Sequence, residues 1–330
     1  MTEPTYDILG IGNAIVDVVA RAEDTFLSRH DMHKGAMNLI DAASADTIYA
    51  AMPPGQESSG GSAANTCAVA AGLGSRVAYI GKVADDQLGQ VFRHDINAVG
   101  VHFPTKPLSG GAPTARCLIL VTPDGQRTMN TFLGACVALA EADVDPALVA
   151  ACAITYLEGY LFDPPAAQAA FRKAAEAAHA AGRRVALSLS DPFCVNRHRP
   201  AFLDLVANHV DILFANETEI TALYERNSFD EAAEAARNDV ALAALTRGEA
   251  GSLILHGKET LRVAAEPAKV EDTTGAGDAY AAGFLAGLTA GKSLTLCGRI
   301  GSIAAAEIIS HYGARPQTDL KALIPEAGSS

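Results

Sequence analysis

The sequence predicts an α/β fold with a mostly parallel sheet and helices on both of its faces. Short apolar runs alternate with longer helical segments along most of the 330 residues, as parallel sheets require. A glycine-rich turn stands directly before a late helical run, at residues 272–278. A β-rich excursion at residues 113–133 interrupts the alternation and predicts a second, smaller sheet. The length allows one large domain or two of ordinary size.

The first expected elements are a buried strand at residues 6–12 and a small, apolar helix at 62–73, with Ser62 as its candidate N-cap. An amphipathic helix follows at 85–99. Further strands are expected at 76–80, 153–157, 184–189, 211–214, 241–245 and 252–256. Further helices are expected at 165–181, 201–207, 217–224, 276–290 and 294–310.

The excursion predicts a β-hairpin. Two β-rich runs, Ala115–Val121 and Arg127–Phe132, flank Pro123-Asp124-Gly125, and Asp-Gly between such runs is a strong turn signal. We expect a β lid at residues 18–38 and 101–133, over a core formed by 1–17, 39–100 and 134–330. An ordinary surface excursion is the alternative. A lid that excludes water would suit phosphoryl transfer, because water competes as the acceptor.

The charge and the cysteine content of the chain limit the classes of partner that it can bind. Lys plus Arg number 25 and Asp plus Glu 38, a net charge of −13, which argues against nucleic acid and anionic membrane surfaces. The six cysteines show no C-x-x-C spacing, so we expect reduced thiols and a cytoplasmic protein. The start of the chain lacks a basic and apolar leader pattern. The sequence leaves a monomer or a homodimer open.

The turn at residues 272–278 reads Asp-Thr-Thr-Gly-Ala-Gly-Asp and precedes a helix. Unpaired amides of Gly275, Ala276 and Gly277, together with the helix dipole, predict an anion site. A carboxylate there would repel a phosphate, unless Asp278 accepts the proton of a hydroxyl that attacks the phosphate. The alternative is an aspartate placed in a first helical turn by the dipole alone.

Two further motifs predict hydroxyl recognition. Gly60 and Gly61 permit close backbone approach before a helix that carries Asn65 on its first turn. Asn13 and Asp17 follow the first strand, at the sheet edge where open α/β sheets bind ligands. Taken alone, either motif could be a loop with a capping residue.

Two weaker motifs are candidates for binding a nucleotide. Asn216 and Glu219 open a helix after a strand, where Glu219 could contact Mg²⁺ through water. Thr246, Gly248 and Gly251 lie in a turn between two strands, which could underlie the phosphates or ribose of a nucleotide. A plain β-turn and ordinary first-turn acids are the alternatives.

Other motif classes are absent or incomplete. Residues 287–293 resemble a P-loop, but the first glycine stands one position too close and the segment follows a helix. A dinucleotide fingerprint at the first strand lacks its third glycine, because position 15 is Ile. This argues against a dehydrogenase. No zinc-binding or serine-hydrolase motif occurs.

Residues 60–65 and 272–278 resemble the two signatures of the ribokinase (PfkB) family of sugar and nucleoside kinases, and the motifs at 216–219 and 246–251 follow in that family's order. The resemblance runs from residue 7 to about 313. The stretches 12–17, 24–27 and 210–219 are similar to the purine-nucleoside branch, with adenosine as the first candidate acceptor.

This resemblance implies a Rossmann-like (ribokinase-like) core, a small β lid and transfer of the ATP γ-phosphate to a 5′-hydroxyl. It implies Asp278 as base, Arg127 as a phosphate-facing charge and Tyr160 as an aromatic against the base. The other implied contacts are Asn13, Asp17, Gly60, Gly61 and Asn65 to the acceptor, Asn216, Thr246, Gly248, Gly251 and Thr274 to the nucleotide, Glu219 to Mg²⁺, and Asp272 to a monovalent cation such as K⁺. The lid residues match the family poorly, so adenosine, inosine, guanosine and a free sugar all stay possible as the acceptor. A non-catalytic nucleoside-binding protein is the remaining alternative.

Overall fold

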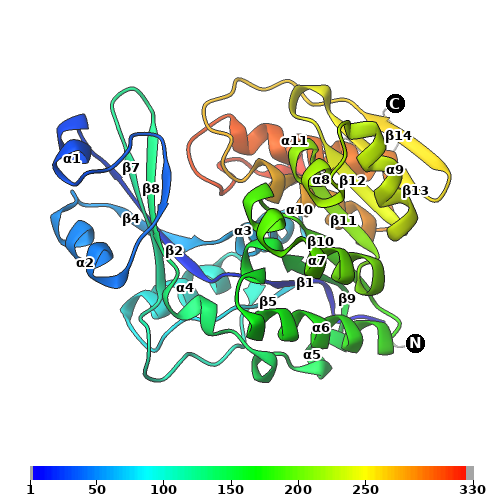
Figure 1. The fold of residues 1–330 in the computed structure, drawn as a ribbon, viewed down its shortest axis with the longest axis horizontal. Coiled ribbons are helices and arrows are strands. Elements are labelled where there is room, and N and C mark those ends of the chain that lie inside the picture. Colours follow the sequence, from blue (N-terminus) through cyan, green and yellow to red (C-terminus); the bar gives the residue numbers. More distant parts are fainter. Residues whose placement is uncertain (1–2, 325–330) are drawn as a thin grey trace.

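The computed structural model describes residues 3–324, within which nine strands form one large sheet (Figure 1). All pairings in it are parallel except those of the last two strands, β13 and β14. In spatial order the strands are β14 (Glu259–Val263), β13 (Ser252–His256), β12 (Leu242–Thr246), β11 (Ile212–Asn216), β10 (Arg184–Ser188), β9 (Cys152–Glu158), β1 (Tyr6–Ile11), β5 (Val77–Ile80) and β6 (Val101–His102).

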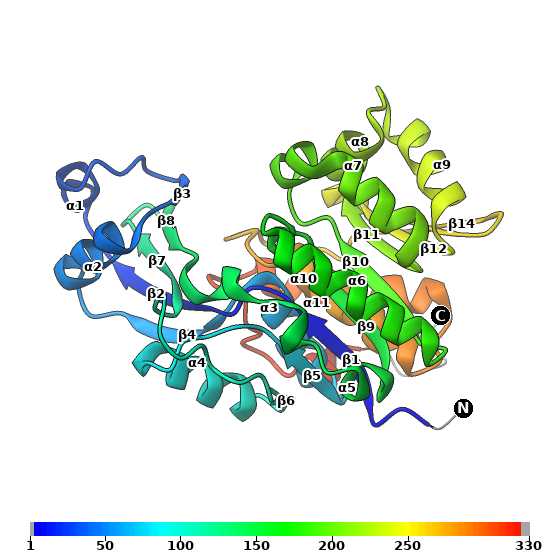
Figure 2. The same ribbon diagram turned by 60° about the horizontal axis from the view of Figure 1, so that its bottom comes forward.

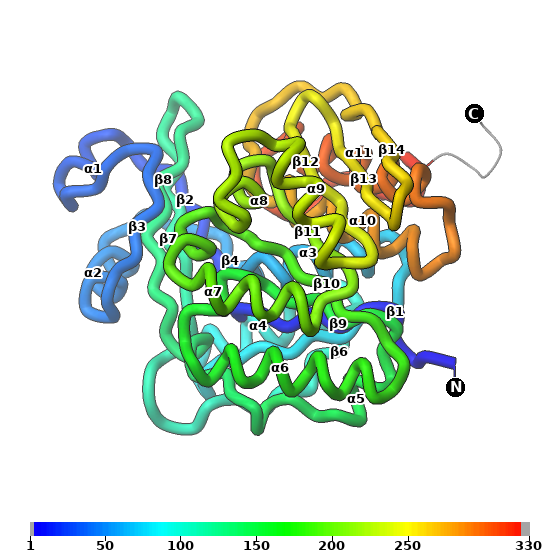
Figure 3. The backbone as a smooth tube through the Cα atoms, turned by 45° about the vertical axis from the view of Figure 1, so that its right-hand side comes forward, coloured from blue at the N-terminus to red at the C-terminus, as the bar shows by residue number. Residues whose placement is uncertain are grey.

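A second sheet stands away from the helical layers at one end of the molecule, on the left in Figure 1. Its spatial order is β3 (Met37–Leu39), β8 (Arg127–Phe132), β7 (Ala115–Val121), β2 (Ile15–Arg21) and β4 (Gln56–Gly60). The helices α1 (Asp24–Arg29) and α2 (Ala42–Ala51) lie beside it (Figure 3). The expected hairpin is therefore present, and its turn contains Gly125 with a φ of 83°.

Helices cover both faces of the large sheet. Successive apolar side chains along its buried strands point to opposite faces, so each face needs a layer of helices to complete a hydrophobic core. Leu9 and Ile11 pack into one core and Ile8 into the other. The first core lies against α5 (Pro146–Ala150), α6 (Pro165–Ala180), α7 (Pro192–His209), α8 (Glu217–Tyr224) and α9 (Phe229–Asp239). The second lies against α3 (Ser62–Gly72), α4 (Gln87–Ala98), α10 (Ala276–Thr289) and α11 (Leu294–Ile309); α12 (Leu320–Leu323) follows (Figure 2).

The predicted α/β architecture is confirmed, and a few elements differ from expectation. Helix α7 begins at Pro192 and not at residue 201, with Pro200 inside it and a kink at His198. Strand β14 was not expected. Strand β4 was not expected either, because Gln56–Gly60 is polar and lacks apolar alternation. The second sheet therefore includes residues beyond 18–38 and 101–133. Within residues 3–324, no helix is long and apolar enough to cross a membrane.

Helices α10 and α11 cross closely where glycines face each other. A Cβ added at Gly283 would lie 2.7 Å from the carbonyl oxygen of Ile300 and 2.8 Å from the Cα of Gly301. We expect Gly283→Ala to lower the free energy of unfolding by about 1–3 kcal/mol, because two backbones must move apart. Urea denaturation measures this. Gly72→Ala is the control, since a Cβ there meets no atom within 4 Å; equal stability of the two variants would contradict the prediction.

Candidate functional site

The predicted site residues gather where the carboxyl ends of β1, β9, β11 and β12 meet the N-termini of α3 and α10. Helix α3 begins directly after β4, and its N-cap is Gly61 with a φ of 96°. Helix α10 begins after the glycine turn, and its N-cap is Gly275 with a φ of 79°. Two positively polarised helix ends therefore face one region.

Asp278 lies between the two helix ends. On the first turn of α10, its Oδ1 accepts a hydrogen bond of 2.6 Å from the Ser62 hydroxyl. Its Oδ2 accepts one of 3.3 Å from the Asn65 side-chain amide. Burial raises the pKa of Asp278 to about 6, against the lowering effect of these two hydrogen bonds. Ser62, expected as an N-cap, instead orients this carboxylate.

Asn13, Asp17, Gly60 and Gly61 lie together next to Asp278. A Cβ at Gly60 would fall 2.3 Å from Oδ2 of Asp17, and one at Gly61 would fall 2.1 Å from the carbonyl oxygen of Asn13. Burial raises the pKa of Asp17 to about 6, and the negative charge of Asp278 adds to this. The predicted hydroxyl-binding residues therefore form one cluster in space.

Glu158, which the sequence reasoning did not single out, connects this cluster. At the end of β9 and only 1% exposed, it accepts hydrogen bonds from the Asn13 side chain at 2.7 Å and the Ala63 amide at 2.7 Å. Burial raises its pKa to about 7 despite these bonds. A Cβ at Gly12 would lie 2.2 Å from Oε2 of Glu158, so glycine is required there for this carboxylate to fit.

The glycine turn exposes backbone to open space. A Cβ at Gly277 would meet no atom within 4 Å, whereas one at Gly275 would lie 2.7 Å from the Cβ of Ala314. The Ala276 amide donates to the carbonyl oxygen of Thr273 at 3.2 Å. The amides of the following first turn have no helical partner by position, so they are the donors that an anion would find.

A cavity of about 160 Å³ adjoins this turn and contains the predicted nucleotide residues Thr246, Gly248 and Gly251. Its other lining residues are Ala265, Glu266, Ala276, Gly277, Tyr280, Ser302, Ala305, Ala306 and Ile309. Asn216 pairs with Thr246 across β11 and β12, so it stands beside this cavity and not in its lining. Thr246, Gly248 and Gly251 therefore border one space with Ala276 and Gly277 of the glycine turn, whereas Thr274 and Gly275 are not in its lining.

Arg127 of the second sheet forms an ion pair with Asp272 of the large domain, and both side chains are at least nine-tenths buried. Asp272 also accepts from the Thr274 amide at 3.0 Å, the Thr274 hydroxyl at 2.7 Å and the Gly313 amide at 3.3 Å. Both oxygens of this carboxylate are saturated, so Asp272 does not fit as a ligand for a monovalent cation. The buried Nε of Arg127 has no partner among the described residues.

Glu219 and Asn216 form a reciprocal cap at the start of α8. Glu219 accepts from the Asn216 amide at 2.9 Å and from its side chain at 2.7 Å. Burial raises the pKa of Glu219 to about 7, and the charges of Asp191 and Asp278 add to this. In residues 3–324, no three His, Cys, Asp or Glu side chains gather around a metal position. Glu219 retains lone pairs for a metal-bound water, which is the contact expected of it.

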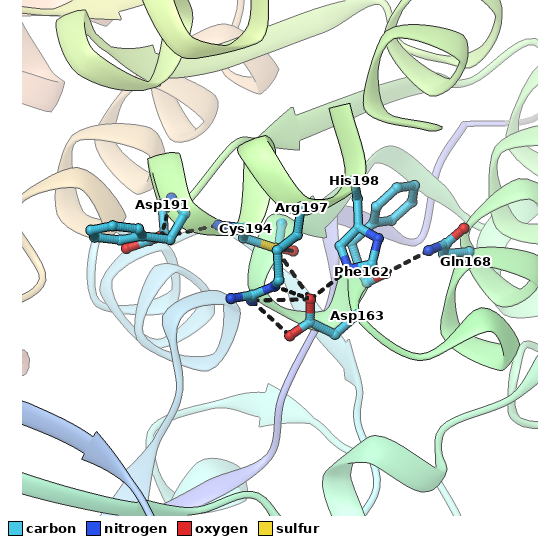
Figure 4. A network of polar contacts seen from close by, with 9 residues as sticks. Phe162, Asp163, Gln168, Asp191, Cys194, Arg197 and His198 are labelled. Carbon is cyan, nitrogen blue, oxygen red and sulfur yellow. Dashed lines mark hydrogen bonds and ion pairs between the residues drawn. The ribbon is translucent and has the colours of Figure 1, made fainter. Parts of the chain in front are cut away.

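Tyr160 is 42% exposed on the short 3₁₀ helix Gly159–Phe162, after β9. The end of this helix is fixed to α7, because Asp163 accepts hydrogen bonds from Arg197 at 2.9 Å and from His198 at 2.7 Å (Figure 4). The Cys194 thiol of α7 also donates to the carbonyl oxygen of Gly159 at 3.2 Å. The pKa of the phenol is raised mainly by burial, and also by Asp191 and Asp278. Tyr160 follows Glu158 by two positions, so it lies just past the carboxyl end of β9, at the edge of the sheet where the site residues gather.

The raised pKa of Asp278 implies a pH-dependent cost in stability. Its ordinary value is 3.8 and its value here is about 6, so between these limits the folded chain binds more protons than the unfolded one. The penalty is therefore fully present above pH 6 and absent below the ordinary value. The free energy that corresponds to this pKa shift is reduced because the side chain is partly exposed. Asp278→Asn should therefore raise the free energy of unfolding at pH 8 by on the order of 1 kcal/mol.

Denaturant unfolding at pH 8 and pH 4 measures this effect. Glu176→Gln, on the exposed face of α6, is the control variant. A gain for Asp278→Asn that is equal at both pH values would contradict the assignment to a buried carboxylate.

Comparison with known proteins identifies the family of this chain. The chain is 28% identical to the adenosine kinase of Saccharomyces cerevisiae, over 94% of this chain and 96% of that protein. Among solved structures, adenosine kinase from Sinorhizobium meliloti is 55% identical with a TM-score of 0.88, covering 96% and 98% of the two chains. A probable sugar kinase from Rhizobium etli is 49% identical with a TM-score of 0.89, covering 97% and 98%. The profile of the pfkB family carbohydrate kinases matches residues 36–320, so the chain belongs to this family of ATP-dependent phosphotransferases.

Proposed function

We propose that this protein transfers the γ-phosphate of ATP to the 5′-hydroxyl of a purine nucleoside, with adenosine as the first acceptor to test. The observation that carries the proposal is the place of Asp278: a half-buried carboxylate between two helix N-termini, next to a cavity bordered by the glycine turn. A pure binding protein has no need of a base at that position.

In the proposed reaction, the acceptor hydroxyl gives its proton to Asp278 while its oxygen bonds to the γ-phosphorus and the bond to the ADP oxygen breaks. A pKa of about 6 leaves Asp278 mainly ionised at neutral pH, yet more basic than an exposed aspartate. Amides of the turn at Gly275–Gly277 would bind the charge on the transferred group. The orphaned Nε of Arg127 is a further donor for a phosphate oxygen.

The acceptor is held, in this proposal, by Asp17 and Asn65 through the two ribose hydroxyls, with Gly60 and Gly61 allowing close approach. Asn13 is oriented by its 2.7 Å bond to Glu158. The exposed ring of Tyr160 offers the base a flat apolar surface. A nucleoside would cover this ring, whereas a free sugar would leave it in water.

The nucleotide would occupy the cavity lined by Thr246, Gly248 and Gly251, with Asn216 at its edge. Mg²⁺ bound to ATP would neutralise phosphate charge, and Glu219 would hold it through a water molecule. Thr274 is bonded to Asp272, so its role would be to shape the turn. The saturated Asp272 carboxylate gives no support for K⁺.

A sugar kinase is the second candidate, because the Rhizobium etli protein that resembles this chain at 49% identity is described as a probable sugar kinase. An ADP-release assay with adenosine, inosine, guanosine, ribose and fructose separates the two. We expect adenosine to give the highest kcat/KM. Turnover of ribose or fructose alone would replace the nucleoside assignment, and no turnover with any acceptor would refute the kinase.

In the same assay, Asp278→Asn should lower kcat by a factor of roughly 10² to 10⁴, because the base is lost while the binding groups remain. Near-complete activity of this variant would remove Asp278 from the reaction. Binding of the acceptor, measured by calorimetry, should persist and serves as the control for folding.

Asp17→Asn should raise the KM for the nucleoside by roughly tenfold or more with a smaller change in kcat, because an amide replaces a charged acceptor of hydroxyl protons. Steady-state kinetics with varied nucleoside measure this. Glu176→Gln, on the exposed face of α6, is the control. An unchanged KM in Asp17→Asn would exclude a direct contact with the acceptor.

A further inference from the structure

The segment Gly313-Ala314-Arg315, which follows α11, touches both glycine turns of the site. Gly313 donates to Asp272 at 3.3 Å, and Ala314 packs against Gly275 so closely that a Cβ there would lie 2.7 Å away. Arg315 reaches the other turn, where β4 passes into α3. One short segment therefore contacts the two loops whose relative position sets the geometry around Asp278.

Arg315 donates three hydrogen bonds to the β4–α3 junction, the stretch from Ser59 to Asn65 where β4 passes into α3. Its Nη1 donates to the carbonyl oxygen of Ala64 at 3.1 Å, and its Nη2 donates to the carbonyl oxygen and the hydroxyl of Ser59 at 2.6 and 2.9 Å. Asp95 of α4 holds the other side of Ser59, accepting from its amide at 2.7 Å and its hydroxyl at 2.5 Å. The guanidinium thus donates from two separate nitrogens to oxygens of two residues, whereas a lysine would have to reach them from a single nitrogen.

The junction that Arg315 grips carries the groups that orient the carboxylates. Ser62 and Asn65 bond to Asp278, and Gly60 lies against Asp17. All of these stand within six residues of Ser59 in the chain. A shift of the junction would therefore move both donors to Asp278 and the backbone beside Asp17.

Within residues 3–324, the hydrogen bonds of Arg315 all go to a hydroxyl and to carbonyl oxygens and none to a carboxylate. Its charge interacts first with Asp95, which also accepts from Ser59, and then with Asp17 and Asp278. It lowers the pKa of both site carboxylates against the raising effect of burial.

We propose that Arg315 is a positioning residue of this site, which fixes the β4–α3 junction and places a positive charge behind Asp17 and Asp278. The proposal rests on the proposed phosphoryl transfer. It concerns a residue that touches neither the acceptor nor the nucleotide cavity, and that acts through the junction and through its charge.

Other charged groups also face these carboxylates. Arg127 lowers the pKa of Asp17, and Asp278 itself raises it. The titration of Asp278 is coupled to four further groups, each of which has a pKa raised in part by its charge: Tyr156 and Glu158 of β9, Tyr160 and Glu219. Arg315 also faces Asp95 and Cys67. Within residues 3–324, Arg315 is the cation whose charge lowers the pKa of both Asp17 and Asp278.

The surroundings of Arg315 make substitution feasible. Arg315 lines a cavity of about 440 Å³ together with Asp95, Thr318 and Asp319. A shorter or uncharged side chain therefore leaves space that water can fill, with no clash.

The test compares Arg315→Met, Arg315→Lys and wild type, with Arg172→Met on the surface of α6 as the matched control. Arg315→Met should lower kcat by roughly ten- to a hundredfold, because the donors to Asp278 are displaced. It should also move the acidic limb of the kcat/KM profile up by roughly one pH unit, because a nearby cation is lost. Arg315→Lys should keep the limb near its wild-type position but recover kcat only in part.

A second readout does not need turnover. Carboxyl ¹³C NMR of aspartate-labelled protein follows the titration of Asp278, assigned by its loss in Asp278→Asn, and the pKa should rise in Arg315→Met and not in Arg172→Met. If the wild type phosphorylates no acceptor, the proposed function fails, and this titration still decides the charge of Arg315. Unchanged kcat and unchanged titration in a folded Arg315→Met would overturn the inference. If Arg315→Met does not fold, Arg315→Lys decides, and full wild-type kcat in it would rule out the positioning role.

Discussion

Two helices, α3 and α10, meet at their N-termini, and the arrangement of the site depends on the carboxylate that lies between them. The positive ends of two helix dipoles repel each other, and each leaves backbone amides without partners. Asp278 offsets both effects, because it belongs to α10 and accepts hydrogen bonds from Ser62 and Asn65 of α3. The same field that stabilises this carboxylate would attract a second anion to the open amides of the glycine turn.

Glycine sets the spacing around this carboxylate. Gly60 and Gly61 lie too close to Asp17 and to the Asn13 backbone to carry a Cβ, and Gly12 lies too close to Glu158. Gly275 has the same relation to Ala314. These contacts come from segments far apart in the chain, so the glycines are required by tertiary approach as well as by backbone conformation. The result is a dense cluster of carboxylates whose burial raises several pKa values at once.

The sequence predicted the parts of this arrangement that are local. The hairpin bounds, Ala115–Val121 and Arg127–Phe132, agree with the strands observed, because alternation and an Asp-Gly turn are short-range signals. Strand β4 was missed because Gln56–Gly60 is polar and pairs only through its backbone. Glu158 and Arg315 were missed because their partners lie 95 or more positions away, and nothing in their neighbourhoods marks them. Ser62 was seen only as a cap, since its bond to Asp278 spans 216 positions.

The two sides of the acceptor region differ in rigidity, and this difference bears on selectivity. The hydroxyl side is built from side chains that are bonded to one another: Asn13 to Glu158, Asn65 to Asp278, with Arg315 behind the junction. In the proposed function, such a side would recognise a vicinal diol on any ring that fits, which ribose and ribonucleosides share. Tyr160, the residue expected against the base, is 42% exposed although the short helix that bears it is tied down by Cys194. A held aromatic ring left in water has free energy to gain from a flat apolar partner. A purine would supply that partner and a free sugar would not, which is the physical argument for a nucleoside in the proposed function.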